Sequence, residues 1–190
     1  MLTLILLRHG QTQWNKDGRV MSRLDIPLND TGQKQVQVSA EKLKAYPVSK
    51  IISSPQLRAL ETAQPIATRL NLPIGIEERL SEMRFDRWEG KDFNEIKGDP
   101  VYKERRQNPF MKPHPEVETV LELFERTKHL LTELVKEQGC IVCVSHMDVL
   151  KAMMCQMVPV PIEEFFTFEI ENATPKVFTF ENNKWLQTTI

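Results

Sequence analysis

The sequence has no excess of either charge. Its 190 residues include 25 Lys and Arg against 26 Asp and Glu, for a formal net charge of -1. Such a balance provides no basic field for nucleic acid or for an anionic membrane surface, so we expect neither as a partner. Long hydrophobic runs are also missing: Leu4–Leu7 is far shorter than the roughly 20 residues that cross a bilayer. The first residues lack the basic segment and cleavage site of a signal peptide, so we expect a cytoplasmic protein.

Cysteine is scarce, with three residues, Cys140, Cys143 and Cys155. An odd number in a chain large enough to fold without disulfides predicts reduced thiols. The spacing "CIVC" matches a redox or metal pair. However, it lies in an apolar run typical of a strand, where positions three apart point to opposite faces. We therefore interpret Cys140 and Cys143 as core residues.

The length and a hydrophobic content of 41% predict one domain over residues 1–190. The chain has no internal repeat, low-complexity segment or Gly/Ser linker. A hairpin turn is expected at Asn182-Asn183. Apolar runs predict strands at Leu2–Leu7, Lys50–Ser53, Ile74–Glu77, Cys140–Val144, Phe165–Ile170 and Lys176–Phe180.

Helical patterns lie between most of these runs. One begins with Asp30 or Thr31 as the N-cap, and the next has Ser54 as its cap, Pro55 at its first position and an expected kink at Pro65. The longest pattern, "ETVLELFERTKHLLTELVKEQG", stops at Gly139 and has an apolar side formed by Val120, Leu121, Phe124, Leu131, Leu134 and Val135. Alternating strands and helices predict an α/β fold, a three-layer αβα sandwich with a mainly parallel central sheet.

Ligands in such folds bind beyond the carboxyl ends of the strands. Arg8, His9 and Gly10 follow the first predicted strand, Arg58 follows the second, and His146 follows Cys140–Val144. Because these ends share one edge of the sheet, we expect the side chains to converge. Arginine forks bind phosphate or carboxylate oxygens, and Gly10 would let the backbone approach the anion closely.

A phosphate held there would meet an imidazole, which is a capable nucleophile when neutral. The reaction would also need an acid to protonate the leaving group. The stretch "RLSEMRFDRWEG" contains four candidates, and spacing alone does not choose among them: Glu78, Glu82, Asp86 and Glu89.

The stretch "LILLRHGQTQWN" resembles the RHG motif of the histidine phosphatase superfamily, also called the phosphoglycerate mutase-like family. Four further stretches resemble the family's other blocks, in the same order: "DIPLNDTG", "ISSPQLRALETA", "LSEMRFDRWEG" and "VCVSHMDVL". The likeness extends from Met1 to Ile190. It implies a phosphoglycerate mutase-like fold.

The resemblance also implies roles for individual residues. His9 would become phosphorylated, and Glu82 would protonate the departing alcohol. Arg8, Arg58 and His146 would hold the phosphoryl oxygens. The substrate-binding residues implied by the same blocks are Thr12, Asn15, Met21, Ser22 and Met147. This chemistry needs no metal and no cofactor, because the arginines and a histidinium supply the positive charge.

Some positions depart from the family pattern. Met21-Ser22 and Met147-Asp148 replace pairs that usually contain glycine, which predicts a narrower and more apolar pocket lip. "EVET" at Glu116–Thr119 stands where "GGES" is frequent. Arg105-Arg106 matches a basic pair of the family's mutases, but "YKERRQNPF" is more typical of a solvated charge run.

The acid block resembles that of the family's phosphatases more than that of its mutases. We therefore expect hydrolysis of a small phosphomonoester through a phosphohistidine. Two alternatives stay open, a cofactor-dependent phosphoglycerate mutase and a weakly catalytic relative with a binding or signalling role. The expected partners are a small phosphorylated metabolite and, if the chain associates, a second copy in a homodimer.

Overall fold

The computed structural model describes residues 1–108, 110–112, 114–158 and 160–188. Within these ranges the chain forms a six-stranded sheet in the order β3-β2-β4-β1-β5-β6. The first four strands in sequence pair in parallel, and β5 and β6 are antiparallel additions at one side. The strands are β1 (Leu2–Arg8), β2 (Val48–Ser53), β3 (Ile74–Ile76), β4 (Gly139–Ser145), β5 (Lys176–Glu181) and β6 (Lys184–Thr188). The mainly parallel α/β sheet is confirmed.

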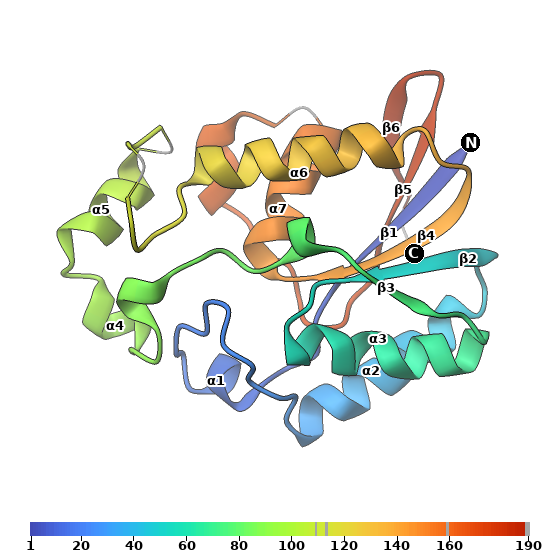
Figure 1. Ribbon diagram of the computed structural model, residues 1–190, viewed down its shortest axis with the longest axis horizontal. Helices are drawn as coiled ribbons and strands as arrows, with labels where there is room; N and C mark the ends of the chain where they lie inside the picture. Colours follow the sequence, from blue (N-terminus) through green and yellow to red (C-terminus); the bar gives the residue numbers. More distant parts are fainter. Residues whose placement is uncertain (109, 113, 159, 189–190) are drawn as a thin grey trace.

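Helices cover both faces of the sheet, with α2 and α3 on one side and α6 and α7 on the other (Figure 1). The α-helices are α1 (Gln13–Lys16), α2 (Asp30–Leu43), α3 (Leu57–Leu70), α4 (Phe93–Ile96), α5 (Pro100–Gln107), α6 (Val120–Leu134) and α7 (Met147–Met157). Three short 3-10 helices, η1 (Glu78–Leu80), η2 (Asp86–Trp88) and η3 (Ile162–Phe166), lie in the connections. This arrangement confirms the three-layer sandwich.

The two cysteines of β4 belong to different cores, because successive strand residues face opposite sides of the sheet. Cys140 packs with the residues under α2 and α3, whereas Cys143 packs with those under α6 and α7. Cys155 of α7 is buried as well, and all three thiols are free. The prediction of core cysteines is confirmed.

One predicted strand is wrong. Phe165–Ile170 does not pair with the sheet, and its first residues belong to η3 instead. Phe165 is fully buried and its ring contacts Phe124 and Phe166 at centroid distances of 5.9 and 4.9 Å. The apolar run therefore reflects packing onto α6 and α7, which periodicity cannot distinguish from a buried strand.

Several helix ends also differ from the predicted ones. Asn29, rather than Asp30 or Thr31, caps α2 by accepting from the Gly32 amide at 2.8 Å. Helix α3 begins at Leu57 instead of Pro55, and it continues through Pro65.

Helix α6 ends at Leu134, so Gly139 is the first residue of β4 and does not end the helix. Leu121, which was predicted on the apolar side of this helix, is exposed. At the other end of the chain, Asn182 and Asn183 have φ of 51° and 58°, as a tight hairpin between β5 and β6 requires. The predicted hairpin is confirmed.

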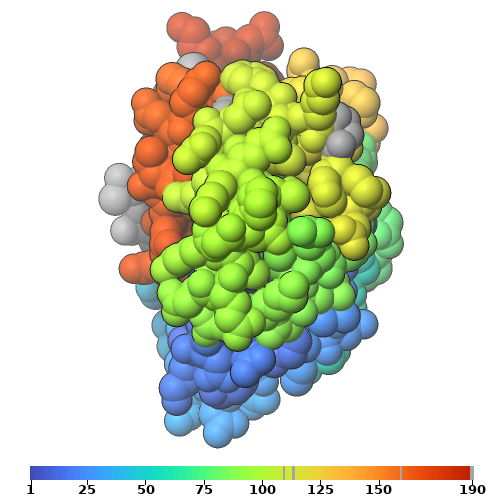
Figure 2. All heavy atoms as spheres, turned by 90° about the vertical axis from the view of Figure 1, so that its left-hand side faces the viewer, coloured from blue at the N-terminus to red at the C-terminus, as the bar shows by residue number. Residues whose placement is uncertain are grey.

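The carboxyl ends of β1, β2 and β4 lie beneath a long connection. Residues 85–108, 110–112 and 114–118, which include α4 and α5, spread over this end of the molecule between the N-terminal segment and the α7–η3 region (Figure 2). The connection therefore encloses the edge at which the predicted site residues lie. No helix in the described ranges is long and apolar enough to cross a membrane.

Candidate active site

Backbone pairing brings three distant loops together. Arg8 lies opposite Ser145 in the β1–β4 register, and the His9 amide donates to the Ser145 carbonyl at 2.9 Å. The Ser54 amide donates to the Val144 carbonyl at 2.9 Å. These bonds continue the sheet by one residue beyond the ends of β1 and β2. The loops that follow β1, β2 and β4 therefore lie side by side, as the sequence predicts.

His9 is held as a neutral imidazole with a defined tautomer. It is 1% exposed, and its Nδ1 lies 2.7 Å from the Gly10 carbonyl. A carbonyl only accepts, so Nδ1 carries the hydrogen and Nε2 keeps its lone pair. Burial, followed by the charges of Arg58 and Arg8, holds the pKa of His9 well below 6.5. The ring therefore presents an unprotonated nitrogen.

Two arginines and a second histidine surround this ring. Arg58 is fully buried and its terminal nitrogens donate to the Leu24 and Ser22 carbonyls, each at 2.8 Å. Arg8 donates to the Ile170 carbonyl at 2.5 Å. Among the described residues, the buried Nε of Arg8, the Nε of Arg58 and the Nδ1 of His146 have no hydrogen-bond partner. Unsatisfied buried nitrogens are costly, and an anion would satisfy the donors.

His146 lies beside His9, with ring centroids 5.2 Å apart. Its Nε2 is 2.7 Å from the Ser54 hydroxyl, which donates its one hydrogen to the Gln56 amide oxygen at 2.5 Å. Nε2 must therefore be the donor, and Nδ1 faces the site. Burial and the nearby charge of Arg58 lower the pKa of His146 well below 6.5. A bound dianion would reverse this electrostatic balance and favour the protonated ring.

Glu82 provides a carboxyl group next to His146. Its Oε2 is 3.8 Å from His146 Nδ1, its Oε1 accepts from the Met83 amide at 2.8 Å, and its side chain is 14% exposed. Burial, together with the charge of Asp148, raises the pKa of Glu82 to about 7, against the opposing charge of Arg58. Both the acid and the carboxylate are therefore accessible near neutral pH.

The structure also separates Glu82 from the other acids of its block. Within the described ranges, Glu82 is the one of the four that lines the cavity beside His9. The Glu78 carboxylate accepts from the Ser81 hydroxyl at 3.4 Å, and Asp86 pairs with Arg84 at 3.4 Å. The spacing of the acids could not make this distinction, because it depends on how the segment after η1 turns.

The cavity beside His9 has a volume of about 580 Å³. Four of the predicted substrate-binding residues line it: Asn15, Met21, Ser22 and Met147. The Ser22 hydroxyl nevertheless accepts from the Phe85 amide at 2.9 Å, so it also fixes the pocket wall. In the described part of the chain, no group of three or more His, Cys, Asp or Glu residues is placed to hold a metal ion.

Thr12 has a different place from the one predicted. It is fully buried and is the N-cap of α1, where its hydroxyl accepts from the Asn15 amide at 3.0 Å and its own amide donates to the Asn15 side chain at 3.0 Å. Its side chain is not part of the described cavity lining. The structure therefore shows Thr12 positioning Asn15, and its contact with substrate stays a prediction.

Gly10 has a packing role in the structure. A Cβ at Gly10 would lie 2.8 Å from the Gly32 carbonyl oxygen and 3.0 Å from Val36 Cγ2. The absent side chain lets the N-terminus of α2 approach the loop after β1. The close approach of α2 is therefore one reason for a glycine here, and the approach of the backbone to an anion stays a prediction.

Arg105 was interpreted as part of a solvated charge run, and this is wrong. It is 4% exposed, donates to Asp148 at 3.0 Å and lies over the ring of Phe85 at 4.8 Å. Arg106 is exposed and stacks on Phe166 at 4.4 Å. Sequence reasoning also missed Lys151, which lines the cavity and is 4% exposed. Its i,i+4 spacing from Met147, which also lines the cavity, is a signal that could have identified it.

Comparisons with known proteins agree with this fold. The sequence profile described as "Histidine phosphatase superfamily (branch 1)" matches residues 4–190. Phosphoserine phosphatase 1 of Hydrogenobacter thermophilus is 31% identical over 190 residues, which cover 97% of this chain and 89% of the relative.

Two further matches name phosphatases. Glucosyl-3-phosphoglycerate phosphatase of Mycolicibacterium vanbaalenii is 30% identical over 173 residues, covering 85% of this chain and 76% of the relative. The solved phosphoserine phosphatase of Entamoeba histolytica, in complex with 3-phosphoglyceric acid, superimposes with a TM-score of 0.89 and is 31% identical, covering 100% of this chain and 96% of that one.

Proposed function

Because this chain belongs to branch 1 of the histidine phosphatase superfamily, we propose that it hydrolyses a small phosphomonoester through a phosphohistidine on His9. The observation that carries the proposal is the neutral imidazole of His9, its Nδ1 engaged by Gly10, among buried nitrogens that lack partners. Such a group is a nucleophile placed next to an anion site.

In the first half-reaction, the phosphate would bind between Arg8, Arg58 and His146. The lone pair of His9 Nε2 attacks phosphorus, and the bond from phosphorus to the alcohol oxygen breaks. Protonated Glu82 gives its proton to the departing oxygen, so the alcohol leaves neutral. The cations stabilise charge that builds on the phosphoryl oxygens, and no metal step is required by this scheme.

In the second half-reaction, the Glu82 carboxylate would take a proton from water as that water attacks phosphorus. The bond from phosphorus to His9 Nε2 breaks, inorganic phosphate leaves, and Glu82 is again protonated. A pKa of about 7 suits both roles, because the group changes protonation state readily at neutral pH.

The walls of the cavity support a substrate that carries a second anionic group. Lys151 and Arg106 line the same cavity as His9; of the acidic residues Asp148 and Glu169, which line it too, Asp148 is paired with Arg105. The relatives are named for phosphoserine and a glucosyl phosphoglycerate, and one solved relative holds 3-phosphoglyceric acid. Each of these molecules contains both a phosphate and a carboxylate. We infer a phosphorylated hydroxy acid or amino acid as the substrate class.

Rapid quenching with a 32P-labelled phosphomonoester tests the mechanism. We expect an acid-labile, base-stable label on the wild-type protein and none on the His9→Ala variant. His129→Ala is the matched control, because His129 is an exposed histidine on α6 and should label normally. Equal labelling of His9→Ala, or turnover by the wild type without any trapped label, would overturn the assignment.

The activity itself needs a substrate panel, run with a chelator present. Phosphoserine, 3-phosphoglycerate, glycerol phosphate and p-nitrophenyl phosphate distinguish acidic from neutral alcohols. Interconversion of 2- and 3-phosphoglycerate with the bisphosphate primer would instead identify a mutase. No turnover by a folded protein that still binds vanadate would favour a binding role.

A further inference from the structure

The segment that carries Glu82 has little regular structure of its own. It leaves η1 at Leu80 and continues without helix or strand through residues 81–84. The Ser145 hydroxyl donates to the Leu80 carbonyl at 2.6 Å, and the Glu82 amide donates to the Gln56 side chain at 3.1 Å. The rest of its placement depends on charged side chains from other parts of the chain.

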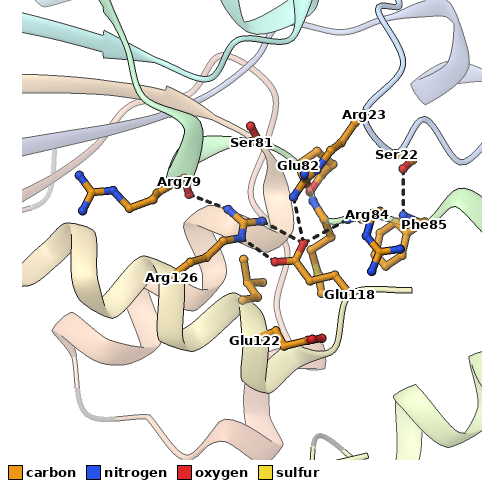
Figure 3. Close-up of polar contacts among 12 residues, drawn as sticks. Ser22, Arg23, Arg79, Ser81, Glu82, Arg84, Phe85, Glu118, Glu122 and Arg126 are labelled. Carbon is orange, nitrogen blue, oxygen red and sulfur yellow. Dashed lines mark hydrogen bonds and ion pairs between the residues drawn. The ribbon is translucent and has the colours of Figure 1, made fainter. Parts of the chain in front are cut away.

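Glu118 binds this segment two residues beyond the acid (Figure 3). Its amide donates to the Arg84 carbonyl at 2.7 Å, and its carboxylate accepts from the Arg84 amide at 3.1 Å. The Glu118 side chain is 9% exposed. One residue at the entrance of α6 therefore satisfies both backbone groups of Arg84.

Arg126, two turns along α6, binds the same carboxylate and reaches the other side of the acid. It donates from Nε to Glu118 Oε1 at 2.6 Å and from Nη2 to Oε2 at 3.2 Å, while Nη1 donates to the Arg79 carbonyl at 2.6 Å. Arg23 completes the set: it donates to the Glu82 carbonyl at 2.9 Å and lies 3.5 Å from Glu118. Figure 3 shows Arg23, Arg84 and Arg126 converging on the Glu118 carboxylate.

We propose that the Glu118–Arg126 ion pair is a positioning element for the catalytic acid, holding the backbone on both sides of Glu82 so that its carboxyl faces His146. The inference rests on the proposed function, in which Glu82 transfers the proton. A buried ion pair is weak support for stability, since apolar residues of similar volume often serve as well. What this pair supplies is a set of directed hydrogen bonds to the backbone of residues 79 and 84.

The pair also acts on Glu82 through charge. The positive charge of Arg126 opposes the rise in the pKa of Glu82, and it also lowers the pKa of His146. Removing Arg126 should therefore raise the pKa of Glu82, whereas removing the negative charge of Glu118 should lower it. The charged and titratable groups around Glu82 are Arg8 of β1, Arg23 of the loop after α1, Arg58 of α3, Arg126 of α6, and His146 and Asp148 at the start of α7.

The test combines kinetics with a direct titration of Glu82 by carboxyl 13C NMR, assigned with the Glu82→Gln variant. In Arg126→Met we expect the pKa of Glu82 to rise by roughly half a pH unit, and in Glu118→Gln to fall by a similar amount. Each should lower kcat about tenfold or more with KM within about twofold, because binding of the phosphate is left intact. Arg126→Lys keeps the positive charge but loses the paired hydrogen bonds of the guanidinium group. The pKa of Glu82 should therefore return toward its wild-type value while kcat stays low.

Glu133→Gln is the matched control. It lies on the same helix and removes a carboxylate that pairs with the exposed side of Arg79 at 2.7 Å, so neither kcat nor the pKa of Glu82 should change. If Arg126→Met does not fold, Glu118→Gln and Arg126→Lys still decide the question.

Folded variants with wild-type kcat and an unchanged pKa of Glu82 would overturn the inference. The titration needs no turnover. Opposite pKa shifts in a protein that hydrolyses no phosphomonoester would therefore show that the pair acts on Glu82 by charge, while refuting both the proposed function and the role of the pair in positioning a catalytic acid.

Discussion

Glu82 should make the folded protein less stable as the pH rises, and Glu82→Gln should remove this effect. The pKa of Glu82, about 7, lies above the ordinary glutamate value of 4.5. Below pH 4.5 the carboxyl is protonated in the folded and unfolded chains alike. Between these two values the unfolded chain loses its proton first, so the free energy of unfolding falls as the pH rises. The loss is complete above the folded pKa.

Each pKa unit corresponds to about 1.4 kcal/mol, so the ionised carboxylate should destabilise the folded protein by about 3 kcal/mol at pH 8. Because the side chain is 14% exposed, solvent should reduce the measured value to roughly 2–3 kcal/mol. His9 and His146 also titrate, but they are present in both proteins and largely cancel from the difference.

Guanidinium unfolding of the wild type and Glu82→Gln from pH 4 to pH 8.5, in buffers without phosphate, measures this effect. The difference in the free energy of unfolding should grow in favour of the variant between pH 4.5 and 7 and then level off. At pH 8 the variant should melt roughly 4–12 °C higher. A difference that does not change with pH would refute the buried, high-pKa carboxyl. A difference in the free energy of unfolding that is the same at every pH would reflect only the local contacts of the glutamine side chain in Glu82→Gln.

Three further outcomes follow from other parts of the structure. With a substrate identified, kcat/KM should fall as the pH rises through about 7, since Glu82 of the free enzyme must be protonated to release the alcohol; a profile of kcat/KM that stays flat to pH 9 would exclude it as the acid. Gly10→Ala should lower the free energy of unfolding by about 1–3 kcal/mol, because its Cβ meets the Gly32 carbonyl, whereas Gly98→Ala, with no atom within 4 Å, should not be destabilised. A thiol reagent at pH 8 should leave the native protein unmodified and label all three cysteines after denaturation. The reason is that burial raises the pKa of Cys140 and Cys155 to about 11 and that of Cys143 further. Labelling of the native protein would contradict the burial of these thiols.

The strands and long helices could be predicted because their signals are local. Apolar runs next to helical patterns predict β1, β2 and β4, and Asn182-Asn183 predicts the hairpin between β5 and β6. The prediction failed at Phe165–Ile170, where an apolar segment is buried by tertiary packing without pairing. Ser54 shows a related limit. Its hydroxyl contacts Gln56 and His146 instead of capping α3, and no short-range pattern could reveal that choice.

The sequence by itself determined which chemical groups stand at the ends of the strands: Arg8 and His9 after β1, Arg58 at the start of α3, and His146 after β4. Parallel pairing makes their convergence a consequence of chain order. Only the tertiary structure decided that Glu82, among four nearby acids, faces His146, and that Gly10 makes room for a helix. It also decided that Arg105 is buried and that Glu118 and Arg126 hold the acid's backbone. These outcomes depend on contacts between residues tens of positions apart, and the distance between two side chains is set by folding and not by spacing.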